Sequence, residues 1–62
     1  MFHVIKATTA RHAPSVPYAT REAAVAAADR AIPSGWDWAV VIEVTVEAVA
    51  TVYRVVRDKE TR

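Results

Sequence analysis

A chain of 62 residues without cysteine forms one small domain at most, and disulfides and thiolate zinc sites are excluded. Its 53% hydrophobic content indicates a packed domain, while a net charge of +1, spread over both halves, gives no support to nucleic-acid binding. Domains of this size usually need an unusually good core or a partner, so we expect self-association. We assign residues 1–58 to a single domain and residues 59–62 to a charged C-terminal tail.

The N-terminal sequence lacks the basic region, the long apolar segment and the cleavage site of a secretory signal. Residues 38–56 are apolar, but Glu43, Glu47 and Arg54 lie among them. Each such charge near the centre of a bilayer costs about 2.5–3.5 kcal/mol. The sequence therefore predicts a cytoplasmic protein without a membrane span.

The first element expected is a short strand over residues 2–8, which are rich in β-branched and aromatic side chains. A connector over residues 9–19 follows. Pro14 and Pro17 fix their own φ angles and favour extended conformations in the residues before them. This pattern predicts neither a helix nor a paired strand in the connector.

Residues 20–31 carry the strongest signal for a helix. Thr20 can cap the first-turn N–H groups, and Glu22 and Arg30 suit the two ends of the helix dipole. Pro33 disfavours continuation of the helix. The inward face of this helix is almost entirely alanine, so we expect it to lie close to a sheet. The side chains available to fill the space between them are Phe2, Trp36, Trp38 and the even-numbered valines.

The segment that follows holds both tryptophans and most of the valines. Residues 40–47 alternate in the manner of a strand with one buried face, with Glu43 and Glu47 on the opposite face. A turn is needed between residues 47 and 50, although no Gly, Pro, Asn or Asp marks it. A last strand then follows. The alternative, a helix over residues 46–58, would cost about 3–4 kcal/mol because β-branched and aromatic residues are poor helix formers.

The predicted fold is a small α+β domain of the split β-α-β-β type. If the last strand lies between the first two, all neighbouring strands are antiparallel and the crossover keeps its usual right hand. The prediction is therefore a three-stranded antiparallel sheet of order 1-3-2 with one helix packed on one face. The other face, or an edge, stays open to a partner.

No group of residues favours catalysis, and the sequence predicts no cofactor and no metal. His3 and His12 have no cysteine and no regular carboxylate spacing around them, and both serines lie outside any nucleophile elbow. Glu43 and Glu47 fit the solvated side of an edge strand better than a glycosidase pair. The sequence therefore predicts that the protein is not an enzyme.

Tryptophan and arginine dominate interface hot spots, and aromatic rings can stack on unpaired bases. The two tryptophans share one face of the strand if the strand begins at the first of them; alternatively, one tryptophan covers the small core. The residues assigned to partner binding are Trp36, Trp38, Tyr53, Arg54 and Arg57.

The sequence thus predicts a non-enzymatic protein–protein interaction module. We expect a homodimeric accessory or regulatory protein that binds a host protein through an open sheet face or edge. Its small size and its bias toward arginine, alanine and valine suggest a phage or mobile-element origin. The alternative is a small nucleic-acid-binding protein that uses the sheet aromatics and the C-terminal arginines, with an affinity that falls steeply with salt.

Overall fold

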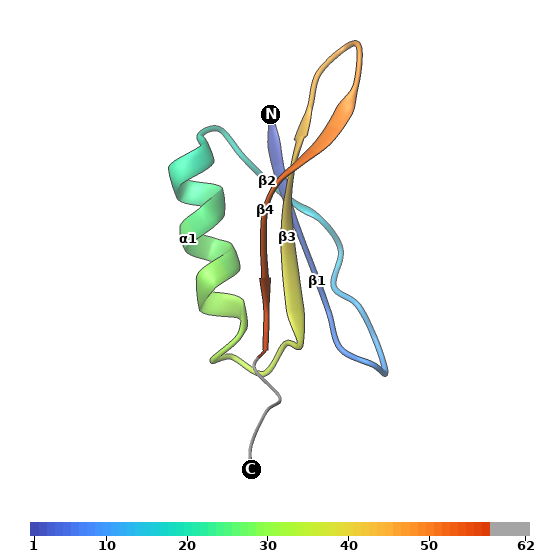
Figure 1. Ribbon diagram of the computed structural model, residues 1–62, viewed down its shortest axis with the longest axis vertical. Helices are drawn as coiled ribbons and strands as arrows, with labels where there is room; N and C mark the ends of the chain where they lie inside the picture. Colours follow the sequence, from blue (N-terminus) through green and yellow to red (C-terminus); the bar gives the residue numbers. More distant parts are fainter. Residues whose placement is uncertain (58–62) are drawn as a thin grey trace.

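The computed structural model describes residues 1–57, and the tail predicted over residues 59–62 lies outside them. One helix packs on one face of a four-stranded antiparallel sheet, giving two layers (Figure 1). The predicted α+β class, with one helix on an antiparallel sheet, is confirmed. The elements in chain order are β1 (Phe2–Ala7), β2 (Val16–Tyr18), α1 (Arg21–Ala31), β3 (Trp38–Val44) and β4 (Val49–Val56).

The sheet has four strands, so the predicted three-stranded sheet is wrong. The additional strand, β2, lies within the segment 9–19 that was assigned to an unpaired connector, and it pairs antiparallel with residues 2–4 of β1. Because β2 lies at the edge of the sheet, Pro17 is tolerated there despite its missing N–H group. The prolines keep this segment extended, as expected, but they do not prevent it from pairing.

The predicted strand order 1-3-2 is also wrong, because the sheet runs β2-β1-β3-β4. β2 reverses the direction of the chain before α1, so β3 returns antiparallel to β1 and pairs with it directly. β3 is therefore a central strand, and β4 is the edge strand. The sequence prediction placed these two strands the other way round.

The hairpin between β3 and β4 turns at residues 45–48. Thr45 donates its backbone N–H to the Ala48 carbonyl over 2.9 Å, and its hydroxyl oxygen accepts from the Ala48 N–H over 3.1 Å. A threonine side chain thus supports a turn that no Gly, Pro, Asn or Asp marks. The described part of the segment 46–58 is a turn and a strand, and the alternative of a helix there is wrong.

α1 begins at the predicted cap. Thr20 is extended, and its hydroxyl oxygen accepts from the Ala23 N–H over 3.2 Å. After the helix, Gly35 has a φ of +110°, a conformation that other residues rarely adopt. This turn leads the chain back under the sheet into β3.

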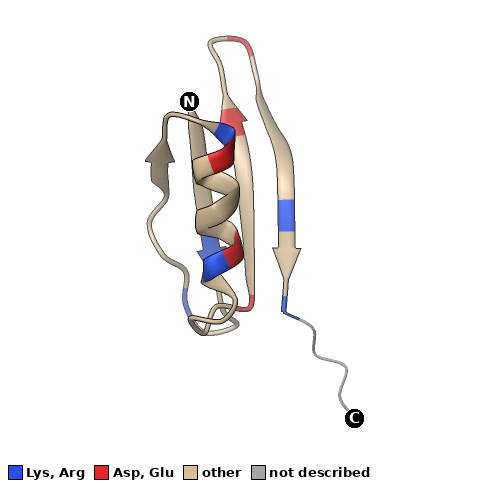
Figure 2. Ribbon diagram, turned by 90° about the vertical axis from the view of Figure 1, so that its left-hand side faces the viewer, with Lys and Arg blue, Asp and Glu red and all other residues tan. Residues whose placement is uncertain are grey.

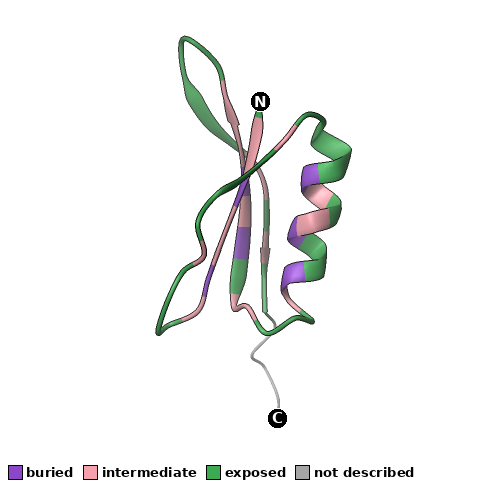
Figure 3. Cartoon of the chain, turned by 180° about the vertical axis from the view of Figure 1, so that it is seen from behind, coloured by how far each residue is buried: buried purple, intermediate pink, exposed green. Residues whose placement is uncertain are grey.

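The core lies between α1 and the sheet, where the buried face of the helix turns toward the strands (Figure 3). Its sheet side is made by the odd-numbered residues of β3, because Ala39 and Val41 are fully buried. The expectation that the even-numbered valines of β3 and Trp38 fill the space beneath the helix is therefore wrong, whereas Phe2 and Trp36 do pack against the core. Small side chains on both layers allow a close approach, and the larger even-numbered side chains face the other way. The buried core cluster consists of Val4, Ala24, Ala28, Ala31, Ala39 and Val41.

Candidate protein interface

The face of the sheet that points away from α1, here called the open face, is apolar and has no described element packed over it (Figure 1). Directly paired residues share a face, so the register places Ile5 and Arg54 beside Val40 on this side. Trp38 is 37% exposed and its neighbour Val56 is 55% exposed. The large apolar side chains of the open face are Ile5, Trp38, Val40, Ile42, Val44, Val49 and Val56.

Two features frame the open face at opposite ends. At one end the hairpin of residues 44–49, here called the arm, projects beyond the rest of the sheet and leans away from α1 (Figure 1). Val46 at its tip is fully exposed and Val49 is 64% exposed. At the other end, the connection between β1 and β2 and the Trp38 side chain border an end groove of about 360 Å³. The lining of the end groove includes Ile5, Ala7, Thr8, Arg11, His12 and Trp38.

The free edge of β4 is poorly suited to pairing with a strand of another chain. The register between β3 and β4 shifts after Val41, and Val52 is the extra residue of the resulting bulge. Arg21 Nη2 also donates to the Val52 carbonyl over 3.3 Å. Bulges and occupied carbonyl groups hinder the addition of another strand.

Trp36 and Trp38 do not share a face, because β3 begins only at Trp38. Trp36 lies on the helix side, where it packs against the core. The Lys6 ammonium lies 5.6 Å and the Arg11 guanidinium 4.9 Å from the centre of its ring. Both cations are within the range of a cation–π interaction, so Trp36 holds the connection between β1 and β2 against the domain.

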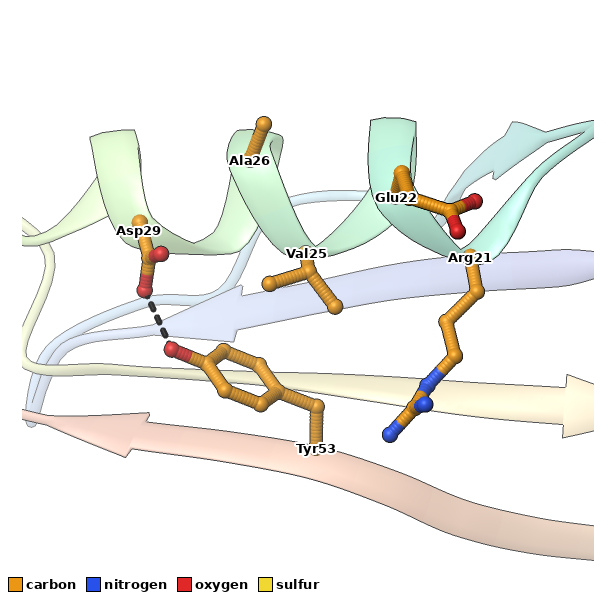
Figure 4. A pocket seen from close by; sticks show the side chains of 6 residues that line it. All are labelled: Arg21, Glu22, Val25, Ala26, Asp29 and Tyr53. Carbon is orange, nitrogen blue, oxygen red and sulfur yellow. Dashed lines mark hydrogen bonds between the residues drawn. The ribbon is translucent and has the colours of Figure 1, made fainter.

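Tyr53 also lies on the helix side, in a groove of about 470 Å³ between α1 and β4 (Figure 4). Its hydroxyl donates to Asp29 Oδ1 over 2.5 Å, which ties the edge strand to the helix. This hydrogen bond to the Asp29 carboxylate, together with desolvation and the negative charge of Asp29, raises the pKa of Tyr53 above the usual value of 10.0. Tyr53 is therefore an anchor of β4.

Replacing Asp29 with asparagine is expected to lower the pKa of Tyr53, since the charged acceptor that favours the neutral phenol is lost. The raised pKa means that the interaction stabilises the fold below pH 10.0 and is lost as the pH rises through the pKa of the folded state. An ultraviolet titration of tyrosinate measures the change, with Glu22→Gln on the same helix as the control. Identical titrations of wild type and Asp29→Asn would contradict the assignment.

The five residues predicted to bind a partner are thus divided between different surfaces. Trp38 and Arg54 lie on the open face, whereas Trp36 and Tyr53 lie on the helix side. Arg57 forms an ion pair with Asp37 over 3.3 Å and closes the lower end of the sheet. Sequence reasoning assigned the even-numbered valines of β3 to the core and so missed them as surface residues, although their alternation had already placed them on one face.

Within residues 1–57, no group of three or more His, Asp or Glu side chains is placed to hold a metal ion. The single helix of the same region, with 11 residues, is too short and not apolar enough to cross a membrane. Comparisons with protein-family models, with curated proteins and with solved structures give no match for this chain.

Proposed function

We propose that this chain is a non-enzymatic protein–protein interaction module that binds another protein chain through its open face. The observation that carries this proposal is the set of large apolar side chains on three adjacent strands with no described element over them. The seven residues of β3 give the face a length of about 23 Å, and three strands give it a width of about 15 Å. Apolar patches of about 300–600 Å² are among the largest on monomeric proteins and often function in binding.

The charge distribution favours a protein over a nucleic acid as the partner. Within residues 1–57, the basic residues are spread over α1, β1, β4 and the β1–β2 connection rather than gathered on one surface (Figure 2). On the open face, His3 and Arg54 are the ionisable groups among the strand residues described, whereas nucleic-acid binding requires several phosphate contacts. A protein partner is therefore favoured. From the size and composition of the chain, we propose a small cytoplasmic accessory or regulatory protein, of phage or mobile-element origin, that acts on a host protein.

A pull-down from host lysate tests the proposal with three tagged proteins: wild type, Val56→Glu and Val16→Glu. Val56 lies on the open face and is 55% exposed, so a charge there is tolerated by the fold but desolvated in the complex. Val16 is the matched control, because it is 40% exposed and its partner in the register, Val4, faces the helix. We expect wild type and Val16→Glu to retain the same protein, and Val56→Glu to lose it.

The conditions of the pull-down separate the proposal from the nucleic-acid alternative. Contacts between apolar side chains withstand nuclease treatment and raised salt, whereas phosphate contacts weaken steeply with salt. Loss of the bound protein after nuclease treatment would contradict the proposal. Equal retention by all three tagged proteins would show that the open face is not the binding surface.

A further inference from the structure

The buried core of this domain is unusually small. The buried hydrophobic residues of the described chain are two valines and five alanines, and Val41 is the largest side chain that is fully buried. Burial of one valine contributes about 1.5–3 kcal/mol, and an alanine contributes less because its side chain has less area. A domain of this size with such a core needs a further source of stability.

The usual sources for small domains are disulfides, a structural metal or a partner. The sequence contains no cysteine, and residues 1–57 place no cluster of three metal-ligating side chains together. The remaining source is the burial of further apolar surface against another chain. The open face, about 23 Å long and about 15 Å wide, and the exposed valines of the arm offer apolar surface for such a contact.

We infer that the chain covering the open face is a second copy of this protein, stacked end over end about a two-fold axis that runs across the strands. The inference rests on the proposed function and names the chain that the open face binds, so the protein retained in the pull-down is an untagged copy of this chain and a host protein binds elsewhere on the dimer. The arm lies at one end of the face and the end groove at the other, and both the arm and the β1–β2 connection that borders the groove extend away from α1 (Figure 1). The two-fold operation therefore places the arm of each copy on the end groove of the other, as a self-complementary interface requires.

The side chains of the arm are complementary to those of the end groove. The arm presents Val46 and Val49, and the end groove has Trp38 in its lining. Glu47 follows Val46 at the tip of the arm, while Arg11, whose guanidinium also lies over the Trp36 ring, contributes to the lining of the groove. End-over-end stacking thus brings unlike charges together twice, whereas a two-fold axis along the strands would place one Glu47 near the other.

The position of Arg54 is compatible with this arrangement. In the end-over-end dimer, Glu47 of each copy lies near Trp38 of the other, so the two-fold axis crosses the strands midway between these two residues. Arg54 lies opposite Val40, which is about 2.5 residues from this axis. The two guanidinium groups are then about 16 Å apart along the strand direction, so no close contact between these like charges arises. The edge of β4 does not offer an equal contact, because its bulge and the Arg21 hydrogen bond interrupt it.

Sedimentation equilibrium and thermal unfolding of the full 62-residue chain test for the second copy. We expect the mass of two chains and a Tm that rises by roughly 10 °C over a hundredfold increase in protein concentration, because unfolding is then coupled to dissociation. The mass of one chain at every concentration, with a constant Tm, would overturn the inference.

Charge reversal tests the end-over-end arrangement. Glu47→Arg and Arg11→Glu are each expected to weaken dimerisation about tenfold, because each exposed contact occurs twice in the dimer. The double variant is expected to recover the affinity that Arg11→Glu loses through charge repulsion. Arg30→Glu, on the exposed part of α1, is the control and is expected to leave dimerisation unchanged. A double variant that dimerises no more tightly than Arg11→Glu would overturn the arrangement, because the lost contact between Arg11 and Trp36 is common to both proteins.

The two proposals fail in different ways. A monomer that retains a host protein, and loses it in Val56→Glu, would overturn the second copy while supporting the open face as a binding surface. A dimer whose affinity is the same in wild type, Val49→Glu and Val56→Glu would place the contact elsewhere and overturn the open face as its site. Val16→Glu is again the matched control, because its exposed valine lies on the other side of the sheet.

Discussion

Replacing Ala28 with leucine is expected to lower the free energy of unfolding by about 1–3 kcal/mol, a large fraction of the stability of so small a domain. Ala28 is fully buried between Ala24 and Ala31 on the face of α1 that packs against the sheet. No small shift of the chain accommodates the added volume, because the neighbours across the layer are backbone and small side chains such as Ala39. A leucine forces the helix away from the sheet.

Urea unfolding followed by circular dichroism, at one fixed protein concentration, measures the loss. Ala26→Leu is the matched control, because Ala26 is exposed on the same helix and leucine has nearly the helix propensity of alanine. We expect the control to change the free energy of unfolding by less than about 0.5 kcal/mol. If Ala28→Leu were as stable as the control, the close packing of α1 on the sheet would not depend on alanine.

The helix was predictable because its signals are local. Thr20 caps it in the structure as the sequence indicates, and the alanines at three- and four-residue intervals form its buried face. The hairpin strands were predictable for a similar reason, since β-branched residues disfavour the rival helix. Only the position of the turn differed, because Thr45 supplies it with side-chain hydrogen bonds.

The strand order was not predictable from these signals because it depends on β2. A strand of three residues that contains Pro17 has no periodicity to reveal it, and only its pairing with β1 makes it a strand. That pairing fixes the direction in which the chain enters α1, and hence whether β3 returns parallel or antiparallel to β1. One short tertiary contact thus determines which strand is central.

The candidate interface was predictable in part. An open sheet face was expected, and Trp38 and Arg54 lie on it, but the sequence did not show which face of β3 is inside. Alternation separates two faces without saying which one packs on the helix. The size of the side chains decides it here, because Ala39 and Val41 leave room for α1 whereas the even-numbered residues are larger. The glutamate on the inner face, Glu43, lies where β3 approaches its end.

Replacing Val41 with threonine is expected to destabilise the fold by about 1–3 kcal/mol. Threonine has nearly the shape of valine and a good strand propensity, so the main effect is the burial of a hydroxyl group. Val41 is fully buried, and its neighbours in the core cluster are apolar side chains such as Val4 and Ala28, which offer the hydroxyl no side-chain partner. The loss is read from thermal unfolding at one protein concentration.

The same substitution at Val16 is the control, because Val16 is 40% exposed on the edge strand β2 and its hydroxyl would be solvated. We expect Val16→Thr to unfold within about 0.5 kcal/mol of the wild type. Equal losses at the two positions would mean that the odd-numbered face of β3 is not the inside of the domain. The even-numbered face of β3 would then be the one that packs against α1. Both the assignment of the open face and the dimer inferred from it would then be wrong.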